Sequence, residues 1–420
     1  MENILVFPAG TEIALEIHDA LQYSKFVCLY GATSVPCHAD FVFSHFVDEA
    51  APFADDPALI PWLNRIIDRY GIDWIYPAHD SALLTLAENR ERLHCPIVAA
   101  PTETVRICRD KNLTYRHLAG SWYLPAFYSS AAEVPAYPVF IKPAVGQGSV
   151  GARRIDSREA LEEALSDGVE YAICEYLPGE EYTVDCFTDR HGELRFAGCR
   201  VRDRILAGIA VHSHALIADE EIRCIAEDIN RKLTFTGAWF FQVKRNRQGE
   251  YRLLEIAPRI AGTMGLTRNR GVNMEMLTLF TLWGYDVDIL VNEVEIHLDR
   301  AFGRCFRTDL RYDTVYLDFA DTLRVKDRID PQMLRFLYQA RNQGKRLTLF
   351  KPAEERLEDY ALPEELFDAI LPDDMQTKLK MVQGSAILID DDVSVRKALH
   401  ARGVPVFSPD MTESLMDARR

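Results

Sequence analysis

Short apolar runs, each followed by a stretch with helical spacing, dominate the first hundred residues. The run at residues 4–7 precedes apolar positions that recur at helical spacing from 13 to 21, and the runs at 26–30 and 74–77 repeat the alternation. Strands that alternate with helices predict a parallel, doubly wound sheet. No G-x-G-x-x-G motif follows the first run, so the fingerprint of dinucleotide binding is absent. We expect this domain to span residues 1–100.

A hairpin is the strongest strand signal in the middle of the chain. Residues 239–259 read as two strands joined by a polar turn at 246–249, where Gly249 supplies the permissive backbone that a hairpin turn needs. We expect a second domain over residues 101–310. Its further strands are predicted at 138–143, 171–177 and 181–187, and its helices at 107–118, 221–233 and 274–285.

The last hundred or so residues return to alternating strands and helices, which predicts a third α/β domain at 311–420. Carboxylates follow two of the expected strands, at Asp318 and at the run Asp390-Asp391-Asp392. Active groups of open parallel sheets lie at the carboxyl ends of strands, so these acids indicate more than a solvated charge run. Strands are predicted at 314–318, 346–350, 385–389 and 404–407, and helices at 332–342 and 394–402.

Composition places the chain among globular proteins and argues against some partners. Its 420 residues carry a formal charge of −16, with 48% hydrophobic and 27% charged residues. We therefore expect no nucleic-acid or anionic-membrane surface, and no stretch reaches the roughly 18–20 apolar residues of a membrane span. The nine cysteines form no C-x-x-C pair and the start of the chain has no basic leader, so a cytoplasmic protein with reduced thiols is expected. Base rates for soluble enzymes predict a homodimer.

The hairpin carries polar groups whose chemistry suits a metal ion. Gln242 on its first strand and Glu255 on its second are each set among apolar neighbours. Oxygen-bearing side chains on adjacent antiparallel strands can point into one site, and Mg²⁺ prefers such ligands. Pro258 ends the ladder and Arg259 follows it, which suits recognition of a phosphate or a carboxylate. The alternative interpretation is a surface hairpin with incidental charges.

Features upstream of the hairpin favour a nucleotide site. Lys142 ends an apolar strand and precedes a loop with three glycines, so an ammonium group and backbone N–H groups can meet phosphates there. Glu175 ends a second strand, where backbone groups can meet an adenine edge, and Glu181 is placed to bind a ribose. In chain order the motifs are R-D-K at 109–111, F-I-K-P-A-V-G-Q-G-S-V-G, C-E-Y-L-P-G-E-E-Y-T-V-D, F-Q-V and L-E-I-A-P-R.

This series of motifs resembles the ATP-grasp superfamily, in particular its carbamoyl-phosphate-synthase-like and carboxylate–amine ligase branch. The resemblance covers residues 1–310 and implies a Rossmann-like pre-ATP-grasp domain followed by an ATP-grasp α+β domain, with ATP and Mg²⁺ as cofactors. It implies catalytic roles for Lys142 and Arg259. It places ATP on Lys111, Lys142, Gly146, Gly148, Ser149, Glu175, Tyr176, Leu177 and Glu181, and Mg²⁺ on Gln242 and Glu255.

The activity that this resemblance implies is transfer of the ATP γ-phosphate to a substrate carboxylate, after which an amine attacks the acyl phosphate. Small-molecule carboxylate and amine substrates are therefore expected, with positioning and charge neutralisation as the contribution of the protein. One position departs from the family, whose members usually carry Asn two residues after the metal-binding glutamate, where this chain has Ala257. A methyl group cannot coordinate Mg²⁺, which leaves Asn246 or water as alternative ligands for a second ion.

Alternating basic residues in the middle domain are further candidates for substrate contacts. Arg200, Arg202 and Arg204 have the spacing of one strand face, where they either hold a phosphate or carboxylate or pair with acids such as Asp203. Weaker candidates are Arg268, Arg270, His212, His214 and the pair His79-Asp80 in a strand-exit loop.

The motifs of the last domain resemble the haloacid-dehalogenase (HAD) superfamily in a capless, Rossmannoid form. V-Y-L-D-F-A-D-T-L is similar to its first motif, in which the aspartate after a strand, here Asp318, is the phosphorylated nucleophile, and Thr322 fits the family threonine. A-I-L-I-D-D-D is similar to its acidic metal motif. The resemblance implies metal ligands at Asp318, Asp390 and Asp391, and a lysine that screens the nucleophile at Lys378 or Lys380.

Two departures favour a degenerate or structural role for this HAD-like domain over a phosphatase. Ala320 stands where the family keeps its general acid, and acid catalysis contributes on the order of 10²- to 10⁴-fold in rate. Lys351 stands where a hydroxyl is expected. Family members that cleave carbon–phosphorus bonds also lack the acid, so Ala320 alone does not prove inactivity.

Three hypotheses for the whole chain follow from the sequence. The first is an ATP- and Mg²⁺-dependent ligase that joins a carboxylate to an amine, with a degenerate HAD-like domain. The second is a HAD-type phosphohydrolase whose ATP-grasp part supplies specificity. The third is a non-catalytic nucleotide-binding scaffold, which Ala257 and Ala320 together motivate.

Overall fold

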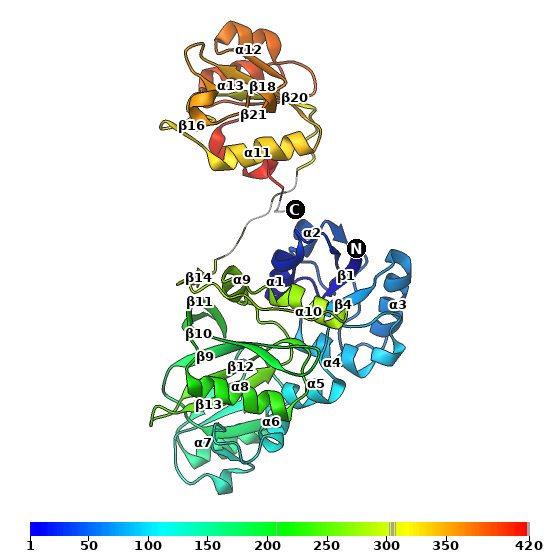
Figure 1. The fold of residues 1–420 in the computed structure, drawn as a ribbon, viewed down its shortest axis with the longest axis vertical. Helices are drawn as coiled ribbons and strands as arrows, with labels where there is room; N and C mark the ends of the chain where they lie inside the picture. Colours follow the sequence, from blue (N-terminus) through cyan, green and yellow to red (C-terminus); the bar gives the residue numbers. More distant parts are fainter. Residues whose placement is uncertain (207, 302, 304–305, 307, 418–420) are drawn as a thin grey trace. The chain divides into compact units, whose positions relative to one another are not determined.

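The computed structural model describes residues 1–206, 208–301, 303, 306 and 308–417. The chain forms two compact units, Met1–Phe302 and Gly303–Arg420, each with its own sheets (Figure 1). The first unit contains residues 1–100 and most of the expected second domain, and the second unit contains residues 311–420. Within the described residues, no helix is long and apolar enough to cross a membrane.

The first sheet of the first unit is parallel, which confirms the prediction from the alternation of strands and helices. Its strands lie in the order β3-β2-β1-β4. Ile4 and Val6 of β1 pack with α1, whereas Leu5 and Phe7 pack with α3, so both faces of the strand are covered and the run is apolar throughout. The elements are β1 (Glu2–Phe7), α1 (Glu12–Leu21), β2 (Val27–Gly31), α2 (Ala39–Val42), β3 (His45–Phe46), α3 (Leu59–Tyr70), β4 (Trp74–Pro77) and α4 (Asp80–Glu88).

A small antiparallel sheet follows, with the strand order β5-β8-β6-β7. The prediction of a single helix at 107–118 is wrong in one respect, because two helices meet there at Asp110. The Asp110 backbone is extended, and its carboxylate accepts hydrogen bonds from the first N–H groups of α6, which makes it an N-cap. The elements are α5 (Thr102–Arg109), α6 (Lys111–His117), β5 (Phe127–Tyr128), β6 (Val139–Pro143), β7 (Arg153–Ile155), α7 (Arg158–Ala164) and β8 (Tyr171–Glu175).

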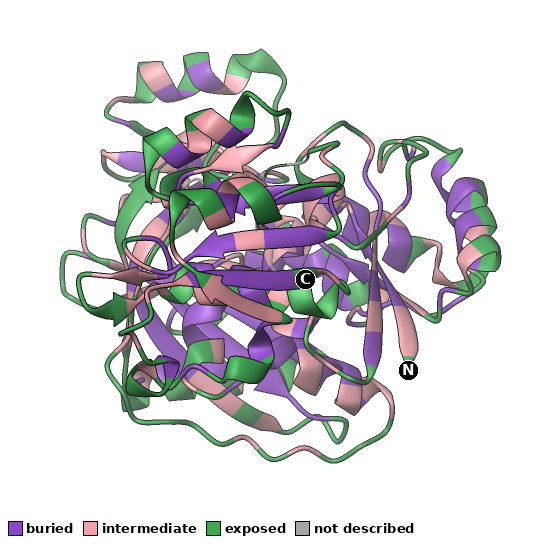
Figure 2. Ribbon diagram, turned by 90° about the horizontal axis from the view of Figure 1, so that it is seen from above, coloured by how far each residue is buried: buried purple, intermediate pink, exposed green. Residues whose placement is uncertain are grey.

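The largest sheet is antiparallel, in the order β13-β12-β9-β10-β11-β14, and contains the expected hairpin. Helix α8 packs on one face through Ile222, Ile225 and Ile229, and alternate residues of the strands point to the opposite face. The strands are largely buried, while the helices carry exposed stripes (Figure 2). The elements are β9 (Glu181–Thr188), β10 (Leu194–Leu206), β11 (Ile209–Leu216), α8 (Glu220–Lys232), β12 (Gly237–Arg245), β13 (Tyr251–Ala257), α9 (Gly265–Asn269), α10 (Met274–Leu282) and β14 (His297–Asp299).

The second unit is built on a parallel sheet with the strand order β19-β18-β15-β20-β21. Its central strand β15 is flanked by β18 and β20, so the carboxyl ends of the three strands meet at one edge. The elements are β15 (Thr314–Asp318), β16 (Arg324–Val325), β17 (Arg328–Ile329), α11 (Pro331–Asn342), β18 (Arg346–Lys351), β19 (Ala369–Pro372), α12 (Met375–Met381), β20 (Ala386–Ile389), α13 (Val393–His400) and β21 (Val406–Phe407).

Candidate active site

Two adjoining cavities lie in the first unit, on the face of the largest sheet that α8 leaves open. The larger has a volume of about 530 Å³ and is bordered by the first residues of α1, by the exit of β4 and by the segment after β13. The smaller, of about 190 Å³, is bordered by β6, the glycine-rich loop and the end of β8. Lys111, Gln242 and Glu255 line both cavities, so the expected metal-binding strands lie at their junction.

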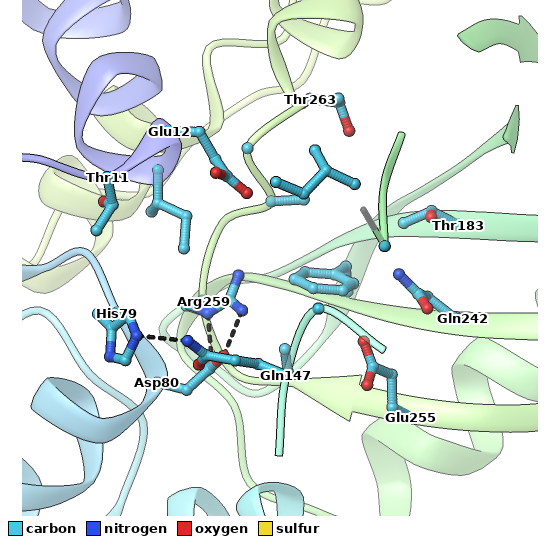
Figure 3. Close-up of a pocket in the computed structure, with 18 of the residues that line it drawn as sticks. Thr11, Glu12, His79, Asp80, Gln147, Thr183, Gln242, Glu255, Arg259 and Thr263 are labelled. Atoms are coloured by element: carbon cyan, nitrogen blue, oxygen red, sulfur yellow. Dashed lines mark hydrogen bonds and ion pairs between the residues drawn. The ribbon is translucent and has the colours of Figure 1, made fainter. Parts of the chain in front are cut away.

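The register of the sheet brings four polar side chains into one row. Glu255 lies directly opposite Gln242, Gln242 opposite Thr183, and Thr183 opposite Arg200. All four line the larger cavity, and Figure 3 shows Gln242, Glu255 and Thr183 close together at one side of it. The two expected metal ligands are therefore brought together on adjacent strands, as the hairpin pattern predicted.

Two lysines reach the junction from outside the sheet. Lys111 is the first residue of α6, and its ammonium group donates to the Gly146 carbonyl at 3.3 Å. Lys142 is the last residue but one of β6 and donates to the Leu254 carbonyl at 2.5 Å. Burial lowers the pKa of both lysines, because the charged form loses its hydration. An anion bound beside the two lysines would stabilise their charged form, and a phosphate group is such an anion.

The glycine-rich loop between β6 and β7 lies over the junction. Gly148 and Ser149 have φ values of 61° and 57°, so two consecutive residues are in the left-handed region. Gln147 contacts His79 of the first domain at 2.6 Å between their side-chain nitrogens (Figure 3). The other ring nitrogen of His79, Nδ1, accepts a hydrogen bond from the Ser81 N–H at 3.2 Å, so the His79 ring connects the glycine-rich loop to the start of α4.

The smaller cavity contains the segment expected to meet the adenine and ribose. Glu175, Tyr176 and Leu177 line it together with Glu181. The Glu175 carboxylate accepts from the Ala126 N–H, so its side chain is already engaged with the backbone. Glu181 forms an ion pair with Arg202 at 2.6 Å and lies 3.6 Å from the ammonium group of Lys244.

Arg259 is held by a residue of the first domain. Its guanidinium forms two hydrogen bonds to the carboxylate of Asp80, at 2.6 and 2.7 Å, and both side chains line the larger cavity (Figure 3). Burial alone would raise the pKa of Asp80, but the charge and hydrogen bonds of Arg259 hold it at about 2. His79-Asp80, a weak candidate from the sequence, thus lies at the cavity.

The Asp80→Asn variant is expected to lose about 2–3 kcal/mol of stability at neutral pH, because Arg259 loses its partner. The folded-state pKa of Asp80 lies below its unfolded value of about 3.9, so the contribution is present above pH ~4 and disappears as the pH falls toward ~2. Urea unfolding at pH 7 and pH 3, followed by tryptophan fluorescence, measures this difference. An equal gap between variant and wild type at both pH values would contradict it.

Several basic candidates do not lie at the cavities. The prediction that Arg204 shares a face with Arg200 and Arg202 is wrong, because a register shift between Arg202 and Arg204 interrupts the alternation. Arg204 pairs instead with Asp299. The others are also engaged elsewhere: His212 with Asp299, His214 with Asp203, and Arg268 with Glu16.

Asn246 is not available as a replacement metal ligand, which corrects the alternative raised by the sequence. It is buried at the hairpin turn, where its side chain bonds to Glu250 and to the backbone N–H of Gln248. Ala257 does line the larger cavity, so a methyl group occupies the position two residues after Glu255.

The second unit contains a separate acidic site around Lys378. Its ammonium group lies 2.6 Å from Asp318, 2.6 Å from Asp373 and 2.8 Å from Asp390. Asp318 ends β15, and Asp390 follows the adjacent strand β20. The structure thus selects Lys378 over the exposed Lys380.

The three carboxylates and one ammonium group of this site are poorly hydrated. Burial raises the pKa of Asp318 to about 8, although Lys378 opposes the shift. Burial opposes the charged form of Lys378, but the hydrogen bonds that it donates to Asp318, Asp373 and Asp390 raise its pKa. Among the described residues, no group of three or more His, Cys, Asp and Glu side chains is arranged to hold a metal ion.

The other residues of the second unit that the sequence likened to HAD motifs lie as follows. The Thr322 hydroxyl accepts from the Asp391 N–H at 3.0 Å and lies 3.3 Å from its carboxylate. Ala320 is half-buried and offers no proton, and Lys351 bonds to carbonyls of its own loop.

Sequence reasoning missed several cavity residues. Glu12, Thr263 and Arg300 line the larger cavity but belong to no motif, and Thr183 lies within the motif C-E-Y-L-P-G-E-E-Y-T-V-D without an assigned role. Thr183 lies on a predicted strand directly opposite Gln242. The pairing of these two strands is therefore the signal that would have identified Thr183. Asp373 of the second unit was missed because it precedes a short helix and follows no recognisable pattern.

The fold and the cavity residues resemble those of ATP-grasp proteins. The comparisons with known proteins find similarity to the same superfamily. Residues 169–297 match the family model described as ATP-grasp in the biosynthetic pathway with Ter operon. This match lies within the first unit and includes both strands of the hairpin.

Individual relatives agree with that class. The arginine-specific carbamoyl phosphate synthase large chain of Bacillus subtilis is 26% identical over 266 residues, which are 58% of this chain and 26% of the relative. A biotin carboxylase domain of Hydrogenobacter thermophilus 2-oxoglutarate carboxylase, solved with MgADP, has a TM-score of 0.56 at 16% identity, covering 68% of this chain and 70% of that one. An L-amino acid ligase from Bacillus licheniformis has a TM-score of 0.52 at 18% identity, covering 67% and 74%.

Proposed function

We propose that the first unit is an ATP- and Mg²⁺-dependent ligase that joins a carboxylate to an amine through an acyl phosphate. The observation that carries the proposal is the direct pairing of Gln242 with Glu255 at the junction of the two cavities. The lysines and the glycine-rich loop border the smaller cavity, and Arg259 borders the larger. The site therefore offers a nucleotide side and a substrate side that share one pair of oxygen ligands.

The residues fit the group that they are proposed to hold. Mg²⁺ is usually bound by one or two carboxylates together with substrate phosphates and water, so Glu255 and Gln242 suffice on the protein side for one ion. A second ion receives no ligand from Ala257. Bound Mg²⁺ would supply neutralisation of the negative charge on the terminal phosphates of ATP.

The side chains of the chain supply positioning and positive charge. Lys111 and Lys142 hold the phosphates from the side of the loop, since burial makes both ammonium groups favour an anionic partner. Arg259, oriented by Asp80, faces the larger cavity, where the carboxylate receives the γ-phosphate. The amine nitrogen then attacks the acyl carbon, phosphate leaves, and the nitrogen loses a proton.

The proposal is tested by ADP and phosphate release from the full chain with ATP, Mg²⁺ and pooled small carboxylic acids and amines. We expect ADP only when both an acid and an amine are present. ATP binding without ADP formation in any mixture, alongside an active control ligase, would favour the non-catalytic scaffold instead.

For the second unit, a HAD-like phosphate site that has lost its general acid is the second candidate. The contacts of Lys378 with Asp318 and Asp390 at neighbouring strand ends support it, and Ala320 argues against fast hydrolysis. In the same assay, phosphate release that survives Lys142→Ala but disappears in Asp318→Asn would make the phosphohydrolase hypothesis the better one.

A further inference from the structure

Three consecutive residues of the first domain contact distant parts of the same unit. His79 follows β4, and Asp80 and Ser81 begin α4. We call these three residues the β4–α4 corner. His79 contacts the side chain of Gln147 in the glycine-rich loop at 2.6 Å, and Asp80 pairs with Arg259 after β13 (Figure 3). The corner therefore contacts both the loop on the nucleotide side and the arginine on the substrate side.

The imidazole ring of His79 is oriented by the helix that it precedes. Its Nδ1 atom accepts from the Ser81 N–H at 3.2 Å, which caps α4, and its carbonyl accepts from the Leu83 N–H at 2.8 Å. The backbone of His79 is extended, as is usual for a residue that caps a helix. Because a rotation of the ring would break the cap, Nε2 is held toward Gln147.

A second contact joins the corner to the preceding residue of the loop. The Arg109 guanidinium donates to the Gly146 carbonyl at 3.1 Å and to the Ser81 hydroxyl at 3.3 Å. Lys111 donates to the same carbonyl at 3.3 Å. Two consecutive loop residues, Gly146 and Gln147, are therefore connected to the corner.

The next residue of the loop meets the hairpin of β10 and β11. A Cβ atom at Gly208 would lie 2.3 Å from the Gly148 carbonyl oxygen, so the two backbones are in close contact. The Gly208 carbonyl accepts from Arg202 at 2.8 Å, and Arg202 also pairs with Glu181 at the smaller cavity. The loop is thus held by the corner of the first domain and by this hairpin of the second.

The loop itself is exposed. Residues 147–151 are all exposed, so little apolar surface stabilises their position. Its backbone bonds are local, from the Val150 N–H to the Gln147 carbonyl and from the Ala152 N–H to the Ser149 carbonyl. Segments with few buried contacts open at a low cost in free energy, so a single polar contact at Gln147 contributes measurably to the position of the loop.

We propose that His79 is a positioning residue that holds the glycine-rich loop over the nucleotide through Gln147. This inference rests on the proposed ligase function and adds to it a residue that lies outside the ATP-grasp motifs. The same corner carries Asp80, so the closure of the loop and the orientation of Arg259 depend on one turn of helix. A loop closed in this way keeps water from the γ-phosphate until a carboxylate lies beside Arg259.

The test combines hydrogen exchange of the full chain with isothermal titration, using Mg²⁺ and a non-hydrolysable ATP analogue as the probe. His79→Asn is the informative variant, because asparagine still caps α4 while its shorter side chain does not reach Gln147. With the analogue bound, we expect residues 146–151 to exchange about tenfold faster in this variant than in wild type. We expect the affinity for the analogue to fall by about threefold to tenfold.

A second variant shows whether the effect passes through Gln147. Gln147→Ala is expected to act like His79→Asn, and the double variant to bind the analogue within about twofold of either single variant, because both substitutions break one contact. His94→Asn in the first domain and Gln248→Ala at the hairpin turn, both exposed, are the matched controls and are expected to behave like wild type.

Three results would overturn the inference. These are unchanged exchange of the loop in His79→Asn, effects of the two substitutions that add in full, and faster exchange spread through α4, which would assign the effect to the helix cap. Wild-type protein that binds no analogue would overturn both this inference and the ligase proposal.

The failure of the ligase proposal alone looks different. Analogue binding and loop exchange that depend on His79, without ADP formation in any mixture of acids and amines, keep the positioning role while the ligase proposal fails. Substrate-dependent ADP formation at the wild-type rate in His79→Asn, with unchanged loop exchange, keeps the ligase while the positioning role fails.

Discussion

Glu255→Ala is expected to slow substrate-dependent ADP formation by at least about 10²-fold, because it removes the carboxylate that borders both cavities. Gln242 alone offers a neutral amide oxygen, which is a weaker ligand for Mg²⁺ than a carboxylate. The phosphates would then lose the charge neutralisation that the transfer requires. Initial rates of ADP release at saturating ATP and Mg²⁺ measure the effect.

The control for this variant is Glu227→Ala, which removes a carboxylate from the exposed face of α8, away from both cavities. We expect wild-type rates for it. A Glu255→Ala protein that keeps more than about a tenth of the wild-type rate would show that the metal ion is not held by the hairpin. Added Mg²⁺ is expected to restore part of a loss that arises from weakened metal binding.

The second large effect is a loss of stability, and it is expected in the second unit. Lys378→Met removes the ammonium group that contacts Asp318, Asp373 and Asp390, and the side chains of Lys378, Asp318 and Asp390 are only 5%, 4% and 1% exposed. Breaking such a buried network typically costs about 3–5 kcal/mol, because uncompensated charge remains. Urea unfolding followed by far-UV circular dichroism is the measurement.

The pH dependence of this loss has a definite sign. Burial already raises the pKa of Asp318 to about 8, and without the ammonium group the carboxylates shift further upward. A carboxylate with a raised folded-state pKa binds more protons when folded, so stability rises as the pH falls. The loss of unfolding free energy in Lys378→Met, relative to wild type, is therefore expected to be largest near pH 8 and to shrink toward pH 5.

Two features make this experiment specific. All five tryptophans, at positions 62, 74, 122, 239 and 283, belong to the first unit, so tryptophan fluorescence does not report directly on the second. Lys380→Met, two residues further along α12 and exposed, is the matched control and is expected to change stability by less than about 0.5 kcal/mol. A fluorescence transition that shifts with Lys378→Met would contradict a purely local effect.

Local patterns predicted the elements of the fold well, since they depend on neighbours along the chain. The parallel sheet at the start of the chain and the hairpin at 239–259 follow from apolar runs and turn residues, and both are confirmed. The hairpin also predicted that Gln242 and Glu255 meet, because a short turn sets the register of its two strands. The break at Asp110 was missed because its capping role is decided by which N–H groups it meets.

Long-range contacts lay beyond the sequence. Asp80 and Arg259 are 179 positions apart, and neither the strand exit nor the end of the hairpin indicates that they pair. The face of the sheet on which Arg204 lies depends on a register shift between Arg202 and Arg204. No residue type in the sequence predicts that shift. Glu12 and Arg300 appear ordinary in the sequence, and only the fold brings both of them to the larger cavity.

The sequence by itself determined most strands and helices and the row of motif residues, because apolar spacing and short motifs act over a few residues. The tertiary structure decided which charges are already paired and which are free to meet a ligand. Charge pairing depends on distances between segments that meet only after folding, as for Lys378 among three carboxylates or Asp80 beside Arg259. The motif residues were therefore readable from the chain, whereas the pairing of charges around them required the tertiary structure.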